Sequence, residues 1–169
     1  MKPVEVSFTV NHRLVRLTSL PNRSLLDILR QDLRLEGAKD SCGGEGECGA
    51  CTVIMNGRVV NSCLVLAGQL DGCTILTIEG LSRGDDLHPI QKAFIEAGAV
   101  QCGYCTPGAI LSAKALLDQV PYPSREQIRE ALSGNLCRCT GYVKMIEAVE
   151  MAAREINRSS AINTESQNE

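Results

Sequence analysis

The chain has 169 residues and a formal net charge of −3, with 17 basic and 20 acidic side chains. Aromatic residues make up 3% and no basic run is present, so we expect no nucleic-acid-binding surface. We also expect no membrane span, because Ser112 and Lys114 break the longest apolar stretch well short of about 18 residues. The composition favours a soluble protein with an unusual number of cysteines, nine in all.

The N-terminus and the cysteines together suggest a compartment. The first ten residues alternate polar and apolar side chains and lack the continuous apolar segment of a secretory signal peptide. A disulfide framework requires an oxidising compartment, whereas thiols stay reduced in the cytoplasm. We therefore expect a cytoplasmic protein whose cysteines serve as metal ligands.

The first element predicted is a β-hairpin. Residues 4–10 alternate apolar and polar side chains as a half-buried strand does, and a turn leads to a second strand over 14–17. A helix is predicted over residues 25–31, because Ser24 and Asp27 have the spacing of a capping box and apolar residues follow at helical intervals.

A second hairpin is predicted over residues 52–60. Asn56 and Gly57 lie between its two apolar runs, and this pair tolerates the positive φ angles of a type I′ turn. A last strand is expected over residues 74–78. Residues 1–80 are thus predicted to form a small α+β domain.

The pattern then changes to helical spacing, and an all-α domain is predicted over residues 81–157. Its four helices are expected over residues 89–97, 108–119, 124–134 and 140–155. Thr106, followed by proline, is typical of a helix start, Ser124 begins a capping box, and Thr140 is expected to cap the last helix. The polar residues 158–169 are expected to form a disordered tail.

Eight of the nine cysteines fall into two sets of four. The first set is Cys42, Cys48, Cys51 and Cys63, and the second set is Cys102, Cys105, Cys137 and Cys139. Intervals of five, two and eleven residues in the first set are close to the plant-type [2Fe-2S] pattern, C-x4-C-x2-C with a distant fourth cysteine. Glycines in this loop allow backbone N–H groups to approach the sulfurs. The ninth cysteine, Cys73, is expected to be a small buried apolar side chain and not a ligand.

The second set consists of a Cys-x2-Cys pair and a Cys-x-Cys pair, each just before a predicted helix start. The free N–H groups and the dipole of a helix N-terminus favour an anion, so two such helices suit an iron–sulfur cluster. Zinc also accepts four thiolates, and a zinc-stapled interaction module is an alternative. An independent two-cluster ferredoxin is another. Bound iron with acid-labile sulfide would distinguish iron from zinc.

Three longer motifs surround these cysteines. They are Glu-Cys-Gly-Ala-Cys-Thr-Val at 47–53, Gln-Cys-Gly-Tyr-Cys-Thr-Pro-Gly at 101–108 and Gly-Asn-Leu-Cys-Arg-Cys-Thr-Gly-Tyr at 134–142. With them, residues 4–155 resemble the small iron–sulfur subunit of the xanthine dehydrogenase family of molybdenum hydroxylases. The resemblance implies a plant-ferredoxin-like β-grasp domain followed by a four-helix domain, each with one [2Fe-2S] cluster. It also implies a non-catalytic electron-transfer subunit of an oxidoreductase.

The resemblance further implies partners and a direction. A large subunit would hold molybdopterin and a medium subunit would hold FAD, in a dimer of heterotrimers. Electrons would pass from molybdenum to the second-set cluster, then to the first-set cluster and to FAD. Gln101 and Cys139 match positions that approach the pterin, so contact with that cofactor is expected there. By the same analogy, the complex is expected to oxidise a purine such as xanthine or, as a second choice, a nicotinate-like N-heterocycle.

One departure from the family pattern lies in the first set. The family usually has four residues between its first two cysteines, whereas five separate Cys42 from Cys48. The additional glycine is expected to be absorbed as a bulge in the loop, with an effect on the geometry, potential or occupancy of the cluster.

Overall fold

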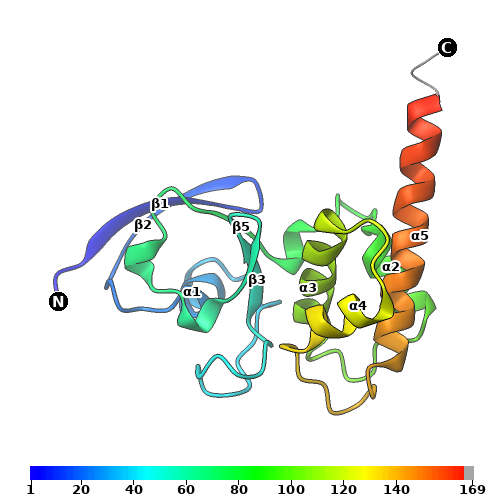
Figure 1. Cartoon of the computed structure of the whole chain (residues 1–169). Coiled ribbons are helices and arrows are strands. Elements are labelled where there is room, and N and C mark those ends of the chain that lie inside the picture. The colour runs from blue at the N-terminus through cyan, green and yellow to red at the C-terminus, as the bar shows by residue number, and fades with distance from the viewer. Residues whose placement is uncertain (166–169) are drawn as a thin grey trace.

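The computed structural model describes residues 1–165, and the side chains of residues 1–159. The predicted α+β class is confirmed: a five-stranded sheet with short helical segments is followed by four longer helices (Figure 1). We call the elements up to Gly80 the sheet part and those from Pro89 onward the helical part. The two parts lie side by side, with the sheet part on the left in Figure 1.

The sheet contains both predicted hairpins. Its strands are β1 (Val4–Val10), β2 (Arg13–Ser19), β3 (Thr52–Met55), β4 (Arg58–Asn61) and β5 (Thr74–Leu76). Their order across the sheet is β2-β1-β5-β3-β4. β1 pairs antiparallel with β2 and parallel with β5, whereas β3 pairs antiparallel with both β4 and β5.

Local sequence explains how these strands form. Val6, Phe8 and Val10 alternate with more exposed residues along β1 and are buried in the core under the sheet. Asn56 and Gly57 have φ of 51° and 77°, as the predicted type I′ turn requires. The β3–β4 hairpin therefore reverses the chain within two residues.

A short helical segment follows β2. The helix predicted over residues 25–31 is present as α1 (Leu25–Asp27), which continues into a π-helical turn, η1 (Ile28–Asp32). Leu25 and Leu29 are fully buried in the core of the sheet part. Burial of this apolar face stabilises a segment too short to be helical alone.

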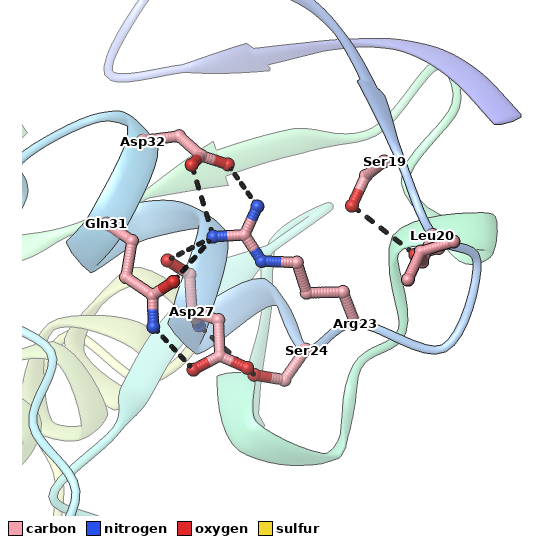
Figure 2. A network of polar contacts seen from close by, with 7 residues as sticks. All are labelled: Ser19, Leu20, Arg23, Ser24, Asp27, Gln31 and Asp32. Carbon is pink, nitrogen blue, oxygen red and sulfur yellow. Dashed lines mark hydrogen bonds and ion pairs between the residues drawn. The ribbon is translucent and has the colours of Figure 1, made fainter. Parts of the chain in front are cut away.

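Polar contacts hold both ends of this segment, as Figure 2 shows. Ser24 Oγ accepts the N–H of Asp27 at 3.1 Å, the helix cap expected from the sequence. Arg23 donates to both carboxylate oxygens of Asp32, at 2.7 and 3.1 Å, and to Gln31 Oε1 at 2.9 Å. The guanidinium thus joins the start of the segment to its end.

Three short 3₁₀ turns complete the sheet part. They are η2 (Ser62–Leu64), η3 (Ala67–Gln69) and η4 (Ile78–Gly80). The Ala67 N–H donates to the Arg23 carbonyl at 2.8 Å, and the Leu25 N–H donates to the Val65 carbonyl at 2.7 Å. These two bonds place the chain that follows Cys63 beside α1.

The helical part contains the four helices expected. They are α2 (Pro89–Glu96), α3 (Thr106–Gln119), α4 (Arg125–Leu132) and α5 (Val143–Glu165). Ile90, Phe94, Ile128, Met145 and Val149 are buried together in their common core. None of the helices in the described part of the chain is long and apolar enough to cross a membrane.

Two predicted helix caps are wrong. Cys105, not Thr106, is the residue at the N-cap of α3. The last helix begins at Val143, three residues after the expected cap Thr140. The Thr140 hydroxyl instead donates to the Cys137 sulfur at 3.1 Å, so a local contact with a candidate ligand replaces the helix cap.

The end of α5 also differs from the prediction. The sequence predicts a disordered tail over 158–169, but α5 continues to Glu165 and projects past the other helices in Figure 1. Asn157 Nδ2 donates to the Pro121 carbonyl at 2.8 Å, which attaches the helix to the loop before α4 and favours its continuation. The prediction for residues 166–169 lies outside the described residues.

The two parts pack on each other through α3 and the sheet. Ile54 of β3 is buried together with Leu111 and Ala115 of α3. Leu76 and Ile78 pack against the same cluster and also against the core of the helical part. This shared apolar contact holds the sheet part against α3.

Candidate iron–sulfur centres

The first set of cysteines lies in the long loop between η1 and β3 and in η2. Cys51 directly precedes β3, and the β3–β4 hairpin returns the chain so that the Cys63 sulfur lies 3.3 Å from that of Cys51. The Ser62 N–H donates to the Cys51 carbonyl at 3.2 Å and stabilises this approach. The Cys42 and Cys48 side chains also influence each other's pKa, so they are near neighbours.

Backbone N–H groups surround the sulfur of Cys42. Those of Glu47 and Cys48 contribute most, and with that of Glu45 they lower the pKa of the Cys42 thiol to about 7. Gly46, with φ of 76°, allows the loop to turn back in this way. The loop therefore presents N–H donors to an anionic centre, as its glycine content suggested.

Two other thiols of the first set have pKa values above that of an ordinary cysteine. Burial raises the pKa of the Cys63 thiol to about 12, and contact with Cys51 adds to the rise. Burial also raises the pKa of the Cys48 thiol. A metal must displace these protons, so metal binding releases protons and weakens in acid.

The second set comes from two loops of the helical part. Cys102 and Cys105 precede α3, whereas Cys137 and Cys139 lie between α4 and α5. The sulfurs of Cys102 and Cys139 are 3.7 Å apart, and the Cys105 and Cys137 side chains influence each other's pKa as near neighbours. One helix N-terminus, that of α3, begins directly at this set. The second expected helix start is not adjacent, because α5 begins only at Val143.

The loop before α5 orients Cys137. Burial would raise the pKa of its thiol, but the Thr140 hydroxyl and N–H, at 3.1 and 3.4 Å from the sulfur, lower it overall. The Cys137 N–H donates to the Tyr142 hydroxyl at 2.7 Å, and that hydroxyl donates to the Asn135 carbonyl at 3.1 Å. On the other side, burial raises the pKa of Cys105 to about 12.

The donors of each centre suit a two-iron cluster. A [2Fe-2S] cluster takes four thiolates, two at each iron. Two sulfurs that share one tetrahedral metal with bonds of about 2.3 Å lie about 3.8 Å apart. The separations of 3.3 Å for Cys51–Cys63 and 3.7 Å for Cys102–Cys139 are close to that value. The thiols lie in pairs, which fits one iron per pair.

The two centres face one crevice of about 470 Å³ between the sheet part and the helical part. Cys42 and Cys48 line it from one part, and Cys105 and Cys137 line it from the other. Beside it, the Leu136 N–H donates to the Cys48 carbonyl at 2.9 Å. Since Leu136 is bonded directly to Cys137, a short bonded path joins a candidate ligand of one centre to a candidate ligand of the other.

Asn135 is a residue of this region that the sequence reasoning missed. Its side chain is 3% exposed. It donates to the Gly49 carbonyl and to Thr52 Oγ1, both at 3.1 Å, and it accepts the Ser112 hydroxyl at 2.6 Å. Three segments thus meet on one amide. The only sequence signal was an asparagine after a glycine and two residues before Cys137, a pattern equally typical of a turn.

Two glycines allow the parts to approach this closely. A side chain on Gly49 would meet the Gly134 carbonyl, and one on Gly108 would meet the Gly49 carbonyl. Gly49 also has φ of 68°, a conformation that favours glycine. We call the residues of this contact the junction, which consists of Cys48, Gly49, Gly108, Asn135 and Leu136.

The remaining predicted positions lie nearer the surface. Gln101 is exposed, as are Cys102 and Cys139, so the residues expected to approach a pterin are accessible. Cys73 lies outside both sets, but it is half-buried and not fully buried as expected. Its thiol donates to the Gln69 carbonyl at 3.3 Å, in the turn before β5.

Two protein-family models match the chain. The 2Fe-2S iron-sulfur cluster binding domain matches residues 8–75, and the [2Fe-2S] binding domain matches residues 77–150. The nicotinate dehydrogenase small FeS subunit of Eubacterium barkeri is 52% identical over 152 residues, which cover 90% of this chain and 96% of that protein. A probable xanthine dehydrogenase subunit of Bacillus subtilis is 44% identical over 157 residues, covering 93% and 90%.

A solved structure is similar over a comparable share of the chain. The crystal structure of quinoline 2-oxidoreductase from Pseudomonas putida 86 contains a chain with a TM-score of 0.88 and 41% identity, covering 94% of this chain and 98% of that one. These relatives do not favour a zinc module or an independent ferredoxin. Two cluster-binding domains in sequence, two sets of paired thiols and relatives of matching length lead to one conclusion. The chain belongs to the small iron–sulfur subunits of the xanthine dehydrogenase family.

Proposed function

We propose that this chain is the electron-transfer subunit of a molybdopterin-dependent hydroxylase. Its ligands are Cys42, Cys48, Cys51 and Cys63 for one [2Fe-2S] cluster and Cys102, Cys105, Cys137 and Cys139 for the other. Each cluster, when bound, supplies a one-electron carrier. Electrons arrive at the second set from molybdopterin on a large subunit and leave from the first set to FAD on a medium subunit.

The junction is the observation that carries this proposal. Electron transfer slows steeply with distance, so a protein that relays electrons must hold its two carriers close together and still. Leu136 donates to Cys48 across the contact, and the buried Asn135 amide fixes the same two loops. A carrier that shuttles freely between enzymes has no need of such a joint.

Exposed side chains near each set of cysteines support the assignment of one partner-facing surface to each cluster. Cys102 and Cys139 are exposed at the second set, and Val143, four residues after Cys139 in the chain, has an exposed apolar side chain. Leu64 and Leu66 are exposed beside Cys63 at the first set. Apolar side chains around a functional site are typical of surfaces that a partner covers. We assign the second-set surface to the large subunit, with Gln101 and Cys139 in contact with its pterin, and the first-set surface to the medium subunit.

The finer architecture belongs to the same proposal. The parallel pairing of β1 with β5 at the centre of the sheet, with α1 packed below it, supports a β-grasp domain over residues 1–80. The common core of α2–α5 supports a four-helix domain over 81–157. Family analogy supports a dimer of heterotrimers. The assignment of eight cysteines as metal ligands, and not as disulfide partners, supports a reducing, cytoplasmic location.

We propose an N-heterocycle as the substrate of the complex. Nicotinate, xanthine, nicotine and quinoline give their names to similar proteins, and all four compounds are N-heterocycles. An aldehyde oxidoreductase subunit of Escherichia coli is 43% identical, however, so similarity in this subunit does not select a substrate. The selection lies in the large subunit, and a nicotinate-like ring and a purine are the two members of the class to test first.

Purification from the native host tests the function. A complex with molybdopterin, FAD and two [2Fe-2S] clusters per copy of this chain supports the proposal. A chain that purifies alone with zinc, and without iron or acid-labile sulfide, refutes it.

Serine variants of the purified chain test the ligands. Cys42→Ser and Cys139→Ser should each weaken or remove one of the two electron paramagnetic resonance signals of the reduced protein. Cys73→Ser is the matched control and should leave both signals unchanged. Two intact signals in either ligand variant would show that the wrong cysteine was assigned.

A further inference from the structure

Tyr104 joins the two parts at a place outside the junction. It lies inside the Cys-x2-Cys pair of the second set, yet its hydroxyl donates to the main-chain carbonyl of Asp40 in the sheet part. The Lys39 ammonium lies over its ring, 5.7 Å from the ring centroid. Its side chain therefore contacts the chain two residues before Cys42, where the first set begins.

Asp40 in turn holds the first part of the Cys42–Cys48 segment, which is one residue longer than the resemblance implies. Its Oδ1 accepts the N–H groups of Gly43 and Gly44, at 2.9 and 3.2 Å. Both glycines have positive φ, 75° and 86°, which other residues rarely adopt. The carboxylate thus closes a turn around Cys42, and the place of that turn depends on where the Asp40 backbone is held.

Different contacts hold the later part of the same loop. Asn61 Nδ2 donates to the Gly46 carbonyl at 2.6 Å, and the Leu136 N–H donates to the Cys48 carbonyl at 2.9 Å. These contacts act after the turn at residues 40–44. Tyr104 contacts Asp40, at the start of that turn. The two ends of the Cys42–Cys48 segment are therefore attached to the helical part by separate hydrogen bonds.

We propose that Tyr104 is a positioning residue that sets the place of Cys42 relative to the helical part. A side chain from the ligand loop of the second cluster thereby controls the first cluster. The inference rests on the proposed function, because it requires that both sets hold clusters. It goes beyond that function because it assigns to the Tyr104 hydroxyl, in the ligand loop of the second cluster, the positioning of a ligand of the first cluster.

The test is Tyr104→Phe in the full-length chain with both clusters reconstituted. The substitution removes the hydroxyl and keeps the ring under Lys39. Release of one hydrogen bond predicts that a chelator removes iron from the first cluster about threefold to tenfold faster. The g values and reduction potential of that cluster should also shift, whereas those of the second cluster should stay as in the wild type. Cys42→Ser and Cys139→Ser identify which signal belongs to which cluster.

Three further variants separate positioning from general damage. Asp40→Ala should reproduce the change in the first cluster, because it opens the turn. Asp40→Asn should leave the first cluster close to its wild-type state, because an amide oxygen still accepts the N–H groups of Gly43 and Gly44. Tyr122→Phe removes the hydroxyl of an exposed tyrosine in the loop between α3 and α4 and should change neither cluster.

The outcomes are distinguishable. A wild-type chain that takes up no iron refutes the proposed function and, with it, this inference. A wild-type chain with two clusters, of which the first is unchanged by Tyr104→Phe, overturns only the inference. A change confined to the second cluster also overturns it.

Discussion

Replacing Asn135 by alanine removes the buried amide at the centre of the junction. Two donated hydrogen bonds are lost, to the Gly49 carbonyl and to Thr52 Oγ1, together with one accepted from the Ser112 hydroxyl. At about 1 kcal/mol each, the three bonds account for about 3 kcal/mol of the free energy of unfolding. A buried hydroxyl left without a partner adds up to about 1 kcal/mol, unless Ser112 bonds to a carbonyl of the preceding turn of α3. We therefore expect a loss of about 3–4 kcal/mol.

Urea unfolding of the cluster-loaded chain, followed by far-ultraviolet circular dichroism, measures this loss. With a slope of about 2 kcal/mol per M, it lowers the urea midpoint by about 1.5–2 M. Asn157→Ala is a matched control, since Asn157 also donates to two backbone carbonyls, of Pro121 at 2.8 Å and Ala153 at 2.7 Å. Water can replace those bonds near the surface, so the control should lose about 1 kcal/mol or less.

Equal midpoints for the two variants would refute the reasoning, because burial would then add nothing to the cost of losing the amide. The magnetic resonance signals give a second readout. Because Asn135 contacts one ligand loop and lies within the other, Asn135→Ala should change both cluster signals. A lower midpoint with two unchanged signals would restrict the role of Asn135 to packing.

Three further predictions concern the junction, the thiols and the clusters. Gly49→Ala should lower the free energy of unfolding by more than Gly57→Ala. Both glycines have positive φ, but only at Gly49 would the new carbon meet the Gly134 carbonyl. Equal losses in the two variants would contradict this role of close packing. Folding raises the thiol pKa of Cys63 and Cys105 to about 12, so these two thiols hold their protons more tightly in the iron-free folded chain than in the unfolded chain. The stability that these two protonated thiols contribute is present below a pH of about 9 and is lost as the pH rises toward about 12. The urea midpoint should therefore fall between these pH values in the iron-free chain but not in the chain that holds both clusters. Finally, stripping iron should reduce helical circular dichroism and the melting temperature, and unchanged values would mean that the apolar cores suffice.

Local patterns in the sequence predicted much of the fold, because they depend on neighbouring residues alone. Asn56 and Gly57 specify their turn through the φ angles that they tolerate. Ser24 and Ser124 begin helices through contacts only three residues long. Spacing likewise indicated the two groups of cysteines, since short intervals limit how the chain can fold around a cluster.

Features that depend on distant contacts were not predictable in the same way. Thr140 has the residue type of a helix cap, but its hydroxyl contacts the Cys137 sulfur, a partner defined only by the folded loop. The contacts of Asn135 with Gly49 and Thr52, and that of Tyr104 with Asp40, could not be foreseen, because these partners lie more than 60 residues away in the sheet part. The grouping of the cysteines could therefore be predicted from the sequence, whereas the residues that hold them in place could not.

The resemblance implies an interval of four residues between the first two cysteines, and the structure indicates where the fifth residue between Cys42 and Cys48 can be accommodated. The later end of that segment is fixed at the junction, where the Cys48 carbonyl accepts from Leu136 and no side chain fits on Gly49. Extra length must therefore be accommodated on the Cys42 side, where Gly43 and Gly44 lie in open space and adopt positive φ. A change there alters the position of one candidate ligand and leaves the link between the two centres intact. Variation in this loop is thus expected to tune the first cluster without interrupting the path from the second.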